Sequence, residues 1–228
     1  QAKARGMNLI AAYGMSETCP LISGAHINDE LLEADEDTRS TFHLKAGVPV
    51  VLVDAAIQAA DGSFLPADGT SQGELVLRAP WLTQGYYNEP EKSEELWADG
   101  WLHTGDVAVI DEMANIEIRD RIKDVIKSGG EWISSIDMET LLMGHPAVRD
   151  AAVVGIPHAK WQERPLALVV LKPGQQATQE QLQQHLTSAF TKWQLPDQVL
   201  FVEAIPKTSV GKLDKKRIRA EHAGRYTE

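Results

Sequence analysis

The sequence predicts an α+β fold in two parts that meet near residues 119–123. Before this point, short apolar segments are separated by glycine and aspartate turns, a pattern typical of a small antiparallel sheet or barrel. After it, apolar strand segments alternate with amphipathic helices. The charge changes too: residues 1–120 hold 7 Lys and Arg against 21 Asp and Glu, and residues 121–228 hold 15 against 12. We therefore expect two domains, residues 1–120 and 121–228.

The first part is predicted to contain short strands and one clear helix. The expected strands are residues 48–57, residues 73–79 and a hairpin over residues 107–118. Residues 90–97 are expected to form a helix, since Pro90 stands where a proline is tolerated in a first turn. Residues 28–42 are acidic and lack a clear apolar face, so we interpret them as surface helix or loop.

The second part is predicted to contain three helices and three strands. The helices are expected at residues 134–145, 178–190 and 213–222, and the strands at residues 151–156, 166–171 and 199–205. Helical spacing of leucines in the first two helices indicates one buried face on each. The expected core consists of apolar residues from these elements: Val153, Val154, Leu168, Val170, Leu182, Leu186, Phe201 and Val202.

The composition is that of an ordinary globular protein, with 43% apolar and 24% charged residues. The single cysteine, Cys19, cannot form an internal disulfide, which favours a reducing compartment and a cytoplasmic location. No apolar run has the ~20 residues that a transmembrane helix needs. The acidic first part argues against a nucleic-acid partner.

The segment YGMSET, residues 13–18, combines groups that suit a nucleotide. The Tyr13 ring could stack on a purine. The Ser16 hydroxyl could donate to a phosphate. The Glu17 carboxylate could hold Mg²⁺, which prefers hard oxygens together with substrate phosphates. The alternative is an ordinary turn with a half-buried tyrosine.

Three further segments could carry chemistry: residues 99–108, residues 119–139, which include both Arg121 and Gly129–Gly130, and residues 205–216. Asp106 follows Gly105 just before a predicted strand, where a carboxylate can meet sugar hydroxyls, or can simply be a turn aspartate. Arg121 could donate to a ribose, although the charged cluster around it could equally be a solvated linker. Gly129–Gly130 would give a flexible bend beside a ligand tunnel. Lys212 follows a glycine in a loop and suits phosphate charge.

Several other chemistries find no support. The Lys212 loop is not a P-loop, because Pro206 and Leu213 stand where that motif needs glycine and serine or threonine. The seven histidines show no metal-ligand spacing, and there is no HExxH or CxxC. With one cysteine and no GxSxG, a nucleophilic hydrolase is not indicated.

The order of the motifs resembles one known family over essentially the whole chain. The run is YGMSET, then GELVLRAPWLTQGYYNEPEKSEELWADGWLHTGD, then RDRIKDVIKSGGEWIS, then PKTSVGKLDKK. It is similar to the acyl-adenylate-forming, or AMP-binding, superfamily. Within it, KSGGEWISSIDME and KWQLPD look most like medium- and long-chain fatty acid–CoA ligases and methylmercaptopropionate–CoA ligases.

The resemblance implies a fold and a set of partners. Residues 1–120 would be the C-terminal part of a large AMP-binding domain, with a barrel-like subdomain, and residues 121–228 a small mobile C-terminal domain. ATP and a carboxylic acid would give an acyl-adenylate and pyrophosphate, and coenzyme A would then displace AMP. Mg²⁺ would be the cofactor, and a homodimer stays open.

The resemblance also implies roles for individual residues. Tyr13 would stack on adenine, Ser16 would take the family's threonine position at the α-phosphate, and Glu17 would bind Mg²⁺. Asp106 and Arg121 would hold the ribose, and Lys123 would be the hinge. Gly129 and Gly130 would line the coenzyme A tunnel, and Lys212 would serve adenylation.

One part of the family pattern is missing from these 228 residues. The family's Ser/Thr/Gly-rich phosphate loop precedes the YGMSET segment and does not occur here, so the chain is expected to be a C-terminal fragment without turnover of its own. Two alternatives stay open: an adenylation domain that loads a carrier protein, and a non-catalytic nucleotide-binding module.

Overall fold

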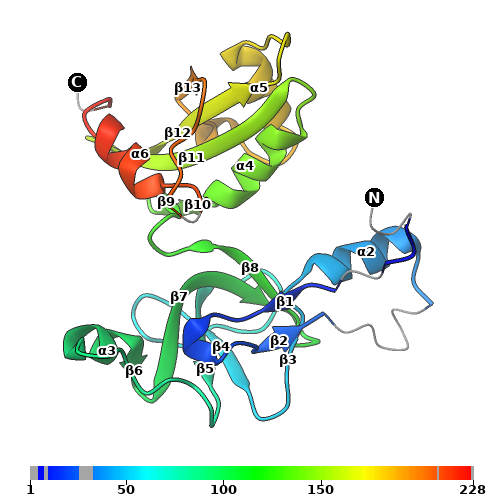
Figure 1. Ribbon diagram of the computed structural model, residues 1–228, viewed down its shortest axis with the longest axis vertical. Coiled ribbons are helices and arrows are strands. Elements are labelled where there is room, and N and C mark those ends of the chain that lie inside the picture. Colours follow the sequence, from blue (N-terminus) through cyan, green and yellow to red (C-terminus); the bar gives the residue numbers. More distant parts are fainter. Residues whose placement is uncertain (1–4, 8–9, 26–32, 210, 227–228) are drawn as a thin grey trace. The chain divides into compact units, whose positions relative to one another are not determined.

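The computed structural model describes residues 5–7, 10–25, 33–209 and 211–226 (Figure 1). The chain divides into two compact units, residues 1–122 and 123–228. Each unit has its own α-helices and β-sheet, so the fold is mixed α/β as expected. The division falls close to the predicted boundary.

An antiparallel sheet of five strands forms the centre of the first unit. Its strands are β4 (Asp54–Gln58), β5 (Gly73–Arg78), β6 (Trp97–Ala98), β7 (Trp101–Ile110) and β8 (Ile116–Arg121). The long strand β7 pairs with β5, β6 and β8. Leu75, Leu77 and Leu102 are fully buried in its core. This sheet carries the half-barrel that the turn-rich sequence predicts.

Smaller elements surround this sheet in the first unit. A three-stranded sheet joins β1 (Ala12–Tyr13), β2 (Ser23–Gly24) and β3 (Val48–Pro49). The 3-10 turn η2 (Ser16–Thr18) lies between β1 and β2, and the helices are α2 (Glu36–Leu44) and α3 (Pro90–Leu96). Pro90 begins α3, which confirms the predicted helix. Helix α2 begins within the acidic segment interpreted as surface helix or loop and ends two residues beyond it; residues 28–32 of that segment lie outside the described residues.

One interpretation of the first unit was wrong, and another holds only in part. Residues 48–57 form two strands and not one, because the chain turns at Val51 and Leu52. Leu52 has a φ of +70° and is 72% exposed. An apolar run hides such a turn from periodicity. The charged cluster around Arg121 is a solvated linker only in part: Arg119, Asp120 and Arg121 belong to β8, where Asp120 is 1% exposed, and Lys123 and Asp124 follow the strand.

The second unit is a sheet with helices on both faces. Its elements are β9 (Ile126–Ser128), β10 (Glu131–Ile133), α4 (Ser135–Gly144), β11 (Val148–His158), β12 (Gln162–Leu171), α5 (Gln179–Leu186), η3 (Lys192–Gln194), β13 (Gln198–Phe201) and α6 (Lys215–His222). Strand β12 pairs with β11 antiparallel and with β13 parallel.

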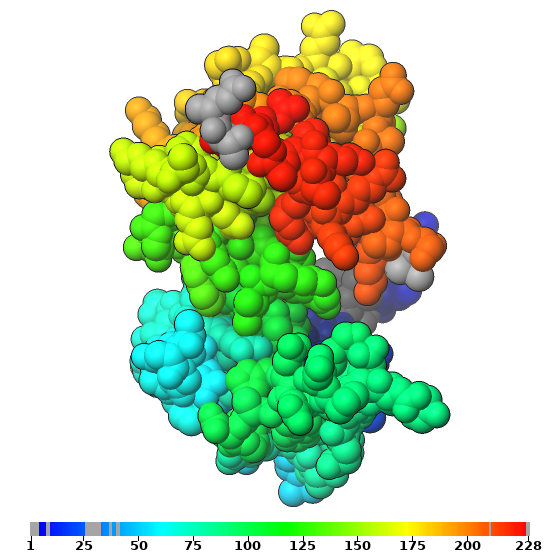
Figure 2. All heavy atoms as spheres, turned by 90° about the vertical axis from the view of Figure 1, so that its left-hand side faces the viewer, coloured from blue at the N-terminus to red at the C-terminus, as the bar shows by residue number. Residues whose placement is uncertain are grey.

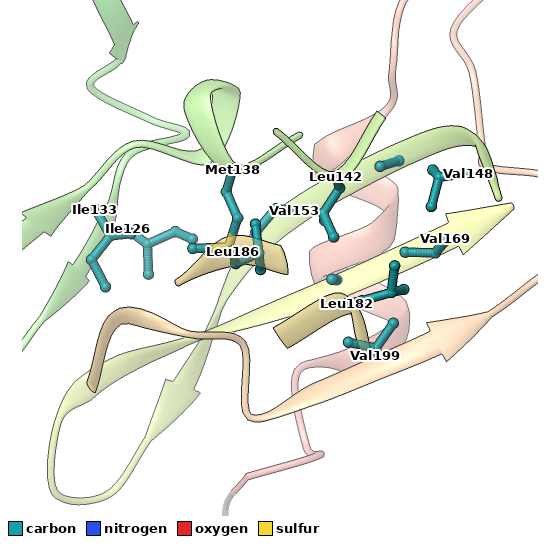
Figure 3. Close-up of a cluster of buried hydrophobic side chains, with 12 residues drawn as sticks. Ile126, Ile133, Met138, Leu142, Val148, Val153, Val169, Leu182, Leu186 and Val199 are labelled. Carbon is teal, nitrogen blue, oxygen red and sulfur yellow. The ribbon is translucent and has the colours of Figure 1, made fainter. Parts of the chain in front are cut away.

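Alternate residues of β11 serve two separate cores. Val153 packs in a cluster with α4 and α5, where Met138, Leu142, Leu182 and Leu186 are fully buried (Figure 3). The neighbouring residues of β11 point to the opposite face, where the cluster includes Ile218 of α6. Strands buried on both faces explain the continuous apolar segments in this part of the sequence.

The predicted core of the second unit is confirmed for six of its eight residues, and Val202 is half-buried against one of the clusters. Phe201 is 44% exposed, because it is the last residue of β13, a short strand that among the described residues pairs with β12 alone. Helix α5 also ends earlier than predicted, at Leu186, although Phe190 still packs against the same cluster.

Candidate nucleotide site

Tyr13, Asp106 and Arg121 lie together in the first unit. Asp106 and Arg121 are register partners across β7 and β8, and Tyr13 comes from β1. The Tyr13 hydroxyl donates to Asp106 Oδ2 at 2.6 Å, and Arg121 Nε lies 3.3 Å from Asp106 Oδ1. The Asp106 side chain is 9% exposed, whereas that of Arg121 is 54% exposed. The carboxylate is therefore held from two sides while the guanidinium faces solvent.

The environment of Tyr13 keeps its hydroxyl protonated. Burial first, and then the hydrogen bond and the negative charge of Asp106, raise the pKa of Tyr13 well above its ordinary value. The phenol therefore stays a hydrogen-bond donor at every physiological pH. With its hydroxyl fixed in this way, the ring has a set orientation and can offer a face to a planar ligand.

The backbone before Asp106 is fixed by a second set of contacts. The Gly105 N–H donates to Glu74 Oε1 at 2.9 Å, and the Asp106 N–H donates to Thr104 Oγ1 at 3.1 Å. Gly105 has a φ of +69°, a backbone conformation that residues other than glycine rarely adopt. The GD pair thus has a conformational reason as well as a chemical one.

Ser16 and Glu17 belong to the η2 turn, which follows Tyr13 in the sequence. The Thr18 hydroxyl closes the turn: it accepts the Met15 N–H at 2.8 Å and lies 2.9 Å from the Met15 carbonyl oxygen. A Cβ on Gly14 would lie 1.6 Å from the Pro20 carbonyl oxygen, so only glycine allows this approach. Ser16 is exposed at the start of the turn.

Tyr86 is a contact of Glu17 that the sequence did not indicate. Its hydroxyl donates to Glu17 Oε1 at 2.6 Å, and the Thr83 N–H donates to the Glu17 carbonyl at 2.9 Å. This hydrogen bond raises the pKa of Tyr86 to about 12. Tyr86 and Gly105 also line one open pocket of about 670 Å³. Tyr86, in the segment after β5, therefore contacts Glu17 and lines the same pocket as the residue that precedes Asp106.

The residues present fit a Mg²⁺ ion shared with a ligand. Within the described residues there is no group of three or more His, Cys, Asp and Glu side chains that could hold a metal alone. Mg²⁺ does not need one, since it is commonly held by one or two carboxylates together with substrate phosphates. Tyr86 orients one oxygen of Glu17, and among the described residues no group bonds the other oxygen.

The other expected site residues lie in the second unit. This unit begins at Lys123, which is exposed. Gly129 and Gly130 form the two-residue turn between β9 and β10, with φ of +62° and +89°. Turns of this kind need positive φ at both positions. The expected flexible bend is thus a tight hairpin turn with a defined shape.

Lys212 is exposed on a loop whose backbone is closed. The Thr208 N–H donates to the Lys212 carbonyl at 2.7 Å, and the Lys212 N–H donates to Thr208 Oγ1 at 3.2 Å. Lys207 and Leu213 form an antiparallel bridge across the loop. Hydrogen bonds therefore hold the backbone of Thr208 and Lys212, while the Lys212 side chain is exposed.

The structure thus brings some of the expected residues together. Tyr13, Asp106 and Arg121 form one cluster, and Ser16 and Glu17 follow Tyr13 in the next turn. The residues of the second unit occupy separate loops of that unit. Besides Tyr86, the sequence did not indicate the role of Glu74. Their contacts cross 69 and 31 positions of the chain, and no local pattern signals them.

Two family models match the chain. Residues 1–87 match the model described as AMP-binding enzyme, and residues 137–212 match that described as AMP-binding enzyme C-terminal domain. The two matches follow each other in chain order and include both YGMSET and Lys212. The chain belongs to the AMP-binding enzyme family.

Its relatives include acid–CoA ligases. The chain is 47% identical over 223 residues to a long-chain-fatty-acid–CoA ligase of Thermus thermophilus, a match that covers 97% of this chain and 41% of the relative. It is 39% identical over 216 residues to a 3-methylmercaptopropionyl-CoA ligase of Ruegeria lacuscaerulensis, covering 95% and 40%. The chain thus spans about two fifths of the length of these relatives.

A solved structure with the same fold contains ATP. The ATP-bound MatB of Rhodopseudomonas palustris matches with a TM-score of 0.82 and 27% identity, over 97% of this chain and 42% of MatB. In the described part of the present chain, no helix is long and apolar enough to cross a membrane.

Proposed function

We propose that this chain works within an ATP-dependent acid–CoA ligase and supplies its nucleotide-binding edge and its adenylation lysine. In the first half-reaction a carboxylate oxygen attacks the α-phosphorus of ATP, and the bond to pyrophosphate breaks. In the second, the coenzyme A thiol attacks the acyl carbon and AMP leaves. The proposal concerns a protein of the relatives' length that carries this chain.

The contact of Tyr13 and Arg121 with Asp106 carries the proposal. A buried carboxylate held on one side by a tyrosine and on the other by an arginine can accept hydrogen bonds from two ribose hydroxyls. The exposed guanidinium of Arg121 is free to donate to the same sugar. The Tyr13 ring lies beside this carboxylate, so adenine stacked on the ring would have its ribose close to Asp106.

Ser16 and Glu17 suit the phosphate end of the nucleotide. An exposed hydroxyl at the start of η2 can donate to an α-phosphate oxygen. Glu17 would hold Mg²⁺ through the oxygen that Tyr86 does not bond. When bound, this ion offsets the negative charge of the phosphates. Tyr86 would orient the Glu17 carboxylate that holds the ion.

We further propose that residues 121–228 form a small domain with separate surfaces for the two half-reactions. Lys123 would be the hinge. Lys212 would lie between the carboxylate and the α-phosphate during adenylation, where one cation orients both groups and offsets the developing charge. The hairpin turn at Gly129–Gly130 would line the path of the coenzyme A thiol.

The acid is proposed to be a fatty acid or a similar aliphatic carboxylate, supported by the two ligases named above. A cytoplasmic location is supported by the exposed free thiol of Cys19. A homodimer stays a prediction. Coenzyme A is the proposed acceptor because the relatives are CoA ligases, and a carrier-protein acceptor is the outcome that would revise it.

Lys212→Ala tests this assignment in the complete protein. Removal of a preorganised cation commonly costs about 100- to 1000-fold in rate. Adenylation, measured as acid-dependent ATP–pyrophosphate exchange over a panel of carboxylates, should fall by that factor. Thioester formation from pre-made acyl-adenylate and CoA should stay within about twofold. Lys216→Ala, an exposed lysine on α6, is the matched control and should change neither rate.

Two results would contradict the assignment. An equal loss in both half-reactions would make Lys212 a structural residue. Unchanged exchange would remove it from the adenylation site. If no carboxylate supports exchange in the unaltered protein, the ligase proposal itself is wrong.

A further inference from the structure

Lys215 is a buried cation that the proposed mechanism does not use. Its Nζ lies 2.7 Å from Glu139 Oε1 and donates to Ser135 Oγ at 2.7 Å. The side chains of Lys215 and Glu139 are 9% and 8% exposed. Glu139 Oε1 also accepts the Val153 N–H at 2.7 Å. This cluster therefore ties the start of α6 to α4 and to β11.

Local preferences alone do not explain where α6 begins. Lys215, Lys216 and Arg217 fill its first turn, at the end of a helix where the backbone dipole disfavours positive charge. Asp214 offsets part of this as the N-cap, accepting the Arg217 N–H at 3.0 Å. Lys216 and Arg217 are exposed, so water screens their charges. The segment that contains α6 forms the red part of the surface in Figure 2. Lys215 is turned inward, and Glu139 supplies its counter-charge.

Lys215 follows Lys212 by three residues, so its buried contacts lie at the end of the Lys212 loop. The Asp214 N–H donates to the Pro206 carbonyl at 2.9 Å, so the end of the loop also holds its beginning. At the beginning, Ile205 is buried, and Lys207 Nζ lies 3.2 Å from Asp150 Oδ2. Between these anchors Gly211 and Lys212 are exposed, and their position depends on the anchors.

A buried ion pair adds little to the free energy of unfolding, since the cost of removing both charges from water offsets most of their attraction. Apolar side chains of similar volume would fill the same space. What the pair adds is one defined geometry, because Lys215 must meet Glu139 and Ser135 at hydrogen-bond distance. A defined geometry matters most beside a residue that must reach a reacting phosphate.

We propose that Lys215, through its buried contact with Glu139, is a positioning residue that sets the place of the Lys212 loop for adenylation. The inference rests on the proposed role of Lys212. Lys215 touches no substrate and acts only through the loop. A misplacement of about 1 Å in a catalytic group can lower a rate by about 100-fold.

The test is the double variant Lys215→Met with Glu139→Gln. It removes both charges, so that no unpaired charge stays buried, and it keeps a side-chain oxygen for the Val153 N–H. The matched control is Arg217→Met with Glu221→Gln, which removes an exposed ion pair from the same helix. The complete protein is assayed for both half-reactions, and its unfolding midpoint is measured.

Three results are expected of the Lys215 double variant. Adenylation falls about 10- to 100-fold, while thioester formation from pre-made acyl-adenylate stays within about twofold. In residues 1–228, the amides of Thr208 and Asp214 exchange with deuterium at least about tenfold faster, while those of β12 keep their rates. The control pair changes none of these.

The inference is overturned if the double variant slows both half-reactions equally, if it leaves adenylation unchanged, or if the control variant gives the same loss. Lys212→Ala, assayed in parallel, separates the two proposals. If Lys212→Ala slows adenylation and the double variant does not, only the role of Lys215 is wrong. If Lys212→Ala has no effect, the proposed function is wrong about Lys212 and the inference is overturned with it.

Discussion

A single hydroxyl decides how Glu17 presents its carboxylate. Tyr86 donates to Oε1 at 2.6 Å and so leaves the other oxygen for a cation. A group that donates a hydrogen bond to a metal-binding carboxylate fixes the orientation of that carboxylate. Loss of such a group commonly weakens metal binding by about 10- to 100-fold. Tyr86 is therefore as much a part of the proposed Mg²⁺ site as Glu17, although it touches no ligand.

Tyr86→Phe should weaken Mg²⁺ binding without unfolding the protein. The ring stays, the hydrogen bond is lost, and Glu17 can rotate. We expect the Mg²⁺ concentration for half-maximal ATP–pyrophosphate exchange to rise about 10-fold or more. Calorimetric titration of Mg²⁺ in the presence of ATP gives the same quantity without turnover.

Tyr87→Phe is the control for this variant, because the neighbouring Tyr87 is 91% exposed. It should leave the Mg²⁺ dependence unchanged. If Tyr86→Phe behaves like Tyr87→Phe, the contact with Glu17 has no bearing on the metal.

At the scale of elements, the Gly129–Gly130 turn gives two neighbouring positions with different surroundings. Both have positive φ, which costs a non-glycine residue about 1–2 kcal/mol. A Cβ on Gly130 meets open space, whereas a Cβ on Gly129 would lie 3.0 Å from Cε3 of the Trp161 ring. Gly129 also donates its N–H to the Trp161 carbonyl at 2.9 Å.

Alanine at these positions should therefore have unequal effects. Gly130→Ala should lower the free energy of unfolding by about 1–2 kcal/mol, which is the strain alone. Gly129→Ala should lower it further, because the tryptophan ring must move as well. Urea unfolding of both variants measures the difference. Equal losses would mean that the Trp161 ring yields without cost, and no loss at either position would contradict the positive φ values.

The elements that could be predicted are those whose ends have local chemistry. Ser134 accepts the Asp137 N–H at 3.1 Å at the start of α4, and Thr178 forms the capping box of α5. Such signals lie within three or four residues and are readable in the sequence. The end of α5 and the turn at Leu52 have no such signal, so their boundaries were missed.

The candidate site divides in the same way. YGMSET and the Gly105–Asp106 pair could be found because several useful groups fall within a few residues. The contact of Lys215 with Ser135 crosses 80 positions, and that of Tyr86 with Glu17 crosses 69. Their existence depends on how α4 meets α6 and how the segment after β5 meets η2, which periodicity does not encode.

At the scale of the whole molecule, the chain holds separate buried clusters. Leu75 and Leu77 belong to a cluster whose members all lie in residues 1–122, and the two clusters on either face of β11 lie in residues 123–228. A unit with its own hydrophobic core can stay folded when the other unit is destabilised. This independence is what the proposed hinge at Lys123 requires, since a domain that rotates must stay folded as it moves.

Two matched leucines test this independence. Leu75 and Leu182 are both fully buried, one in each unit, and replacing a buried leucine with alanine costs about 2–5 kcal/mol. We expect Leu75→Ala to speed deuterium exchange in the protected amides of β5 and β7 alone. Leu182→Ala should speed exchange in α4, α5 and β12 alone. Mass spectrometry of peptic peptides from the exchanged chain resolves the two regions. If either variant speeds exchange across both regions to the same degree, the chain unfolds as one cooperative body, and the proposal of a domain that moves about Lys123 loses its physical basis.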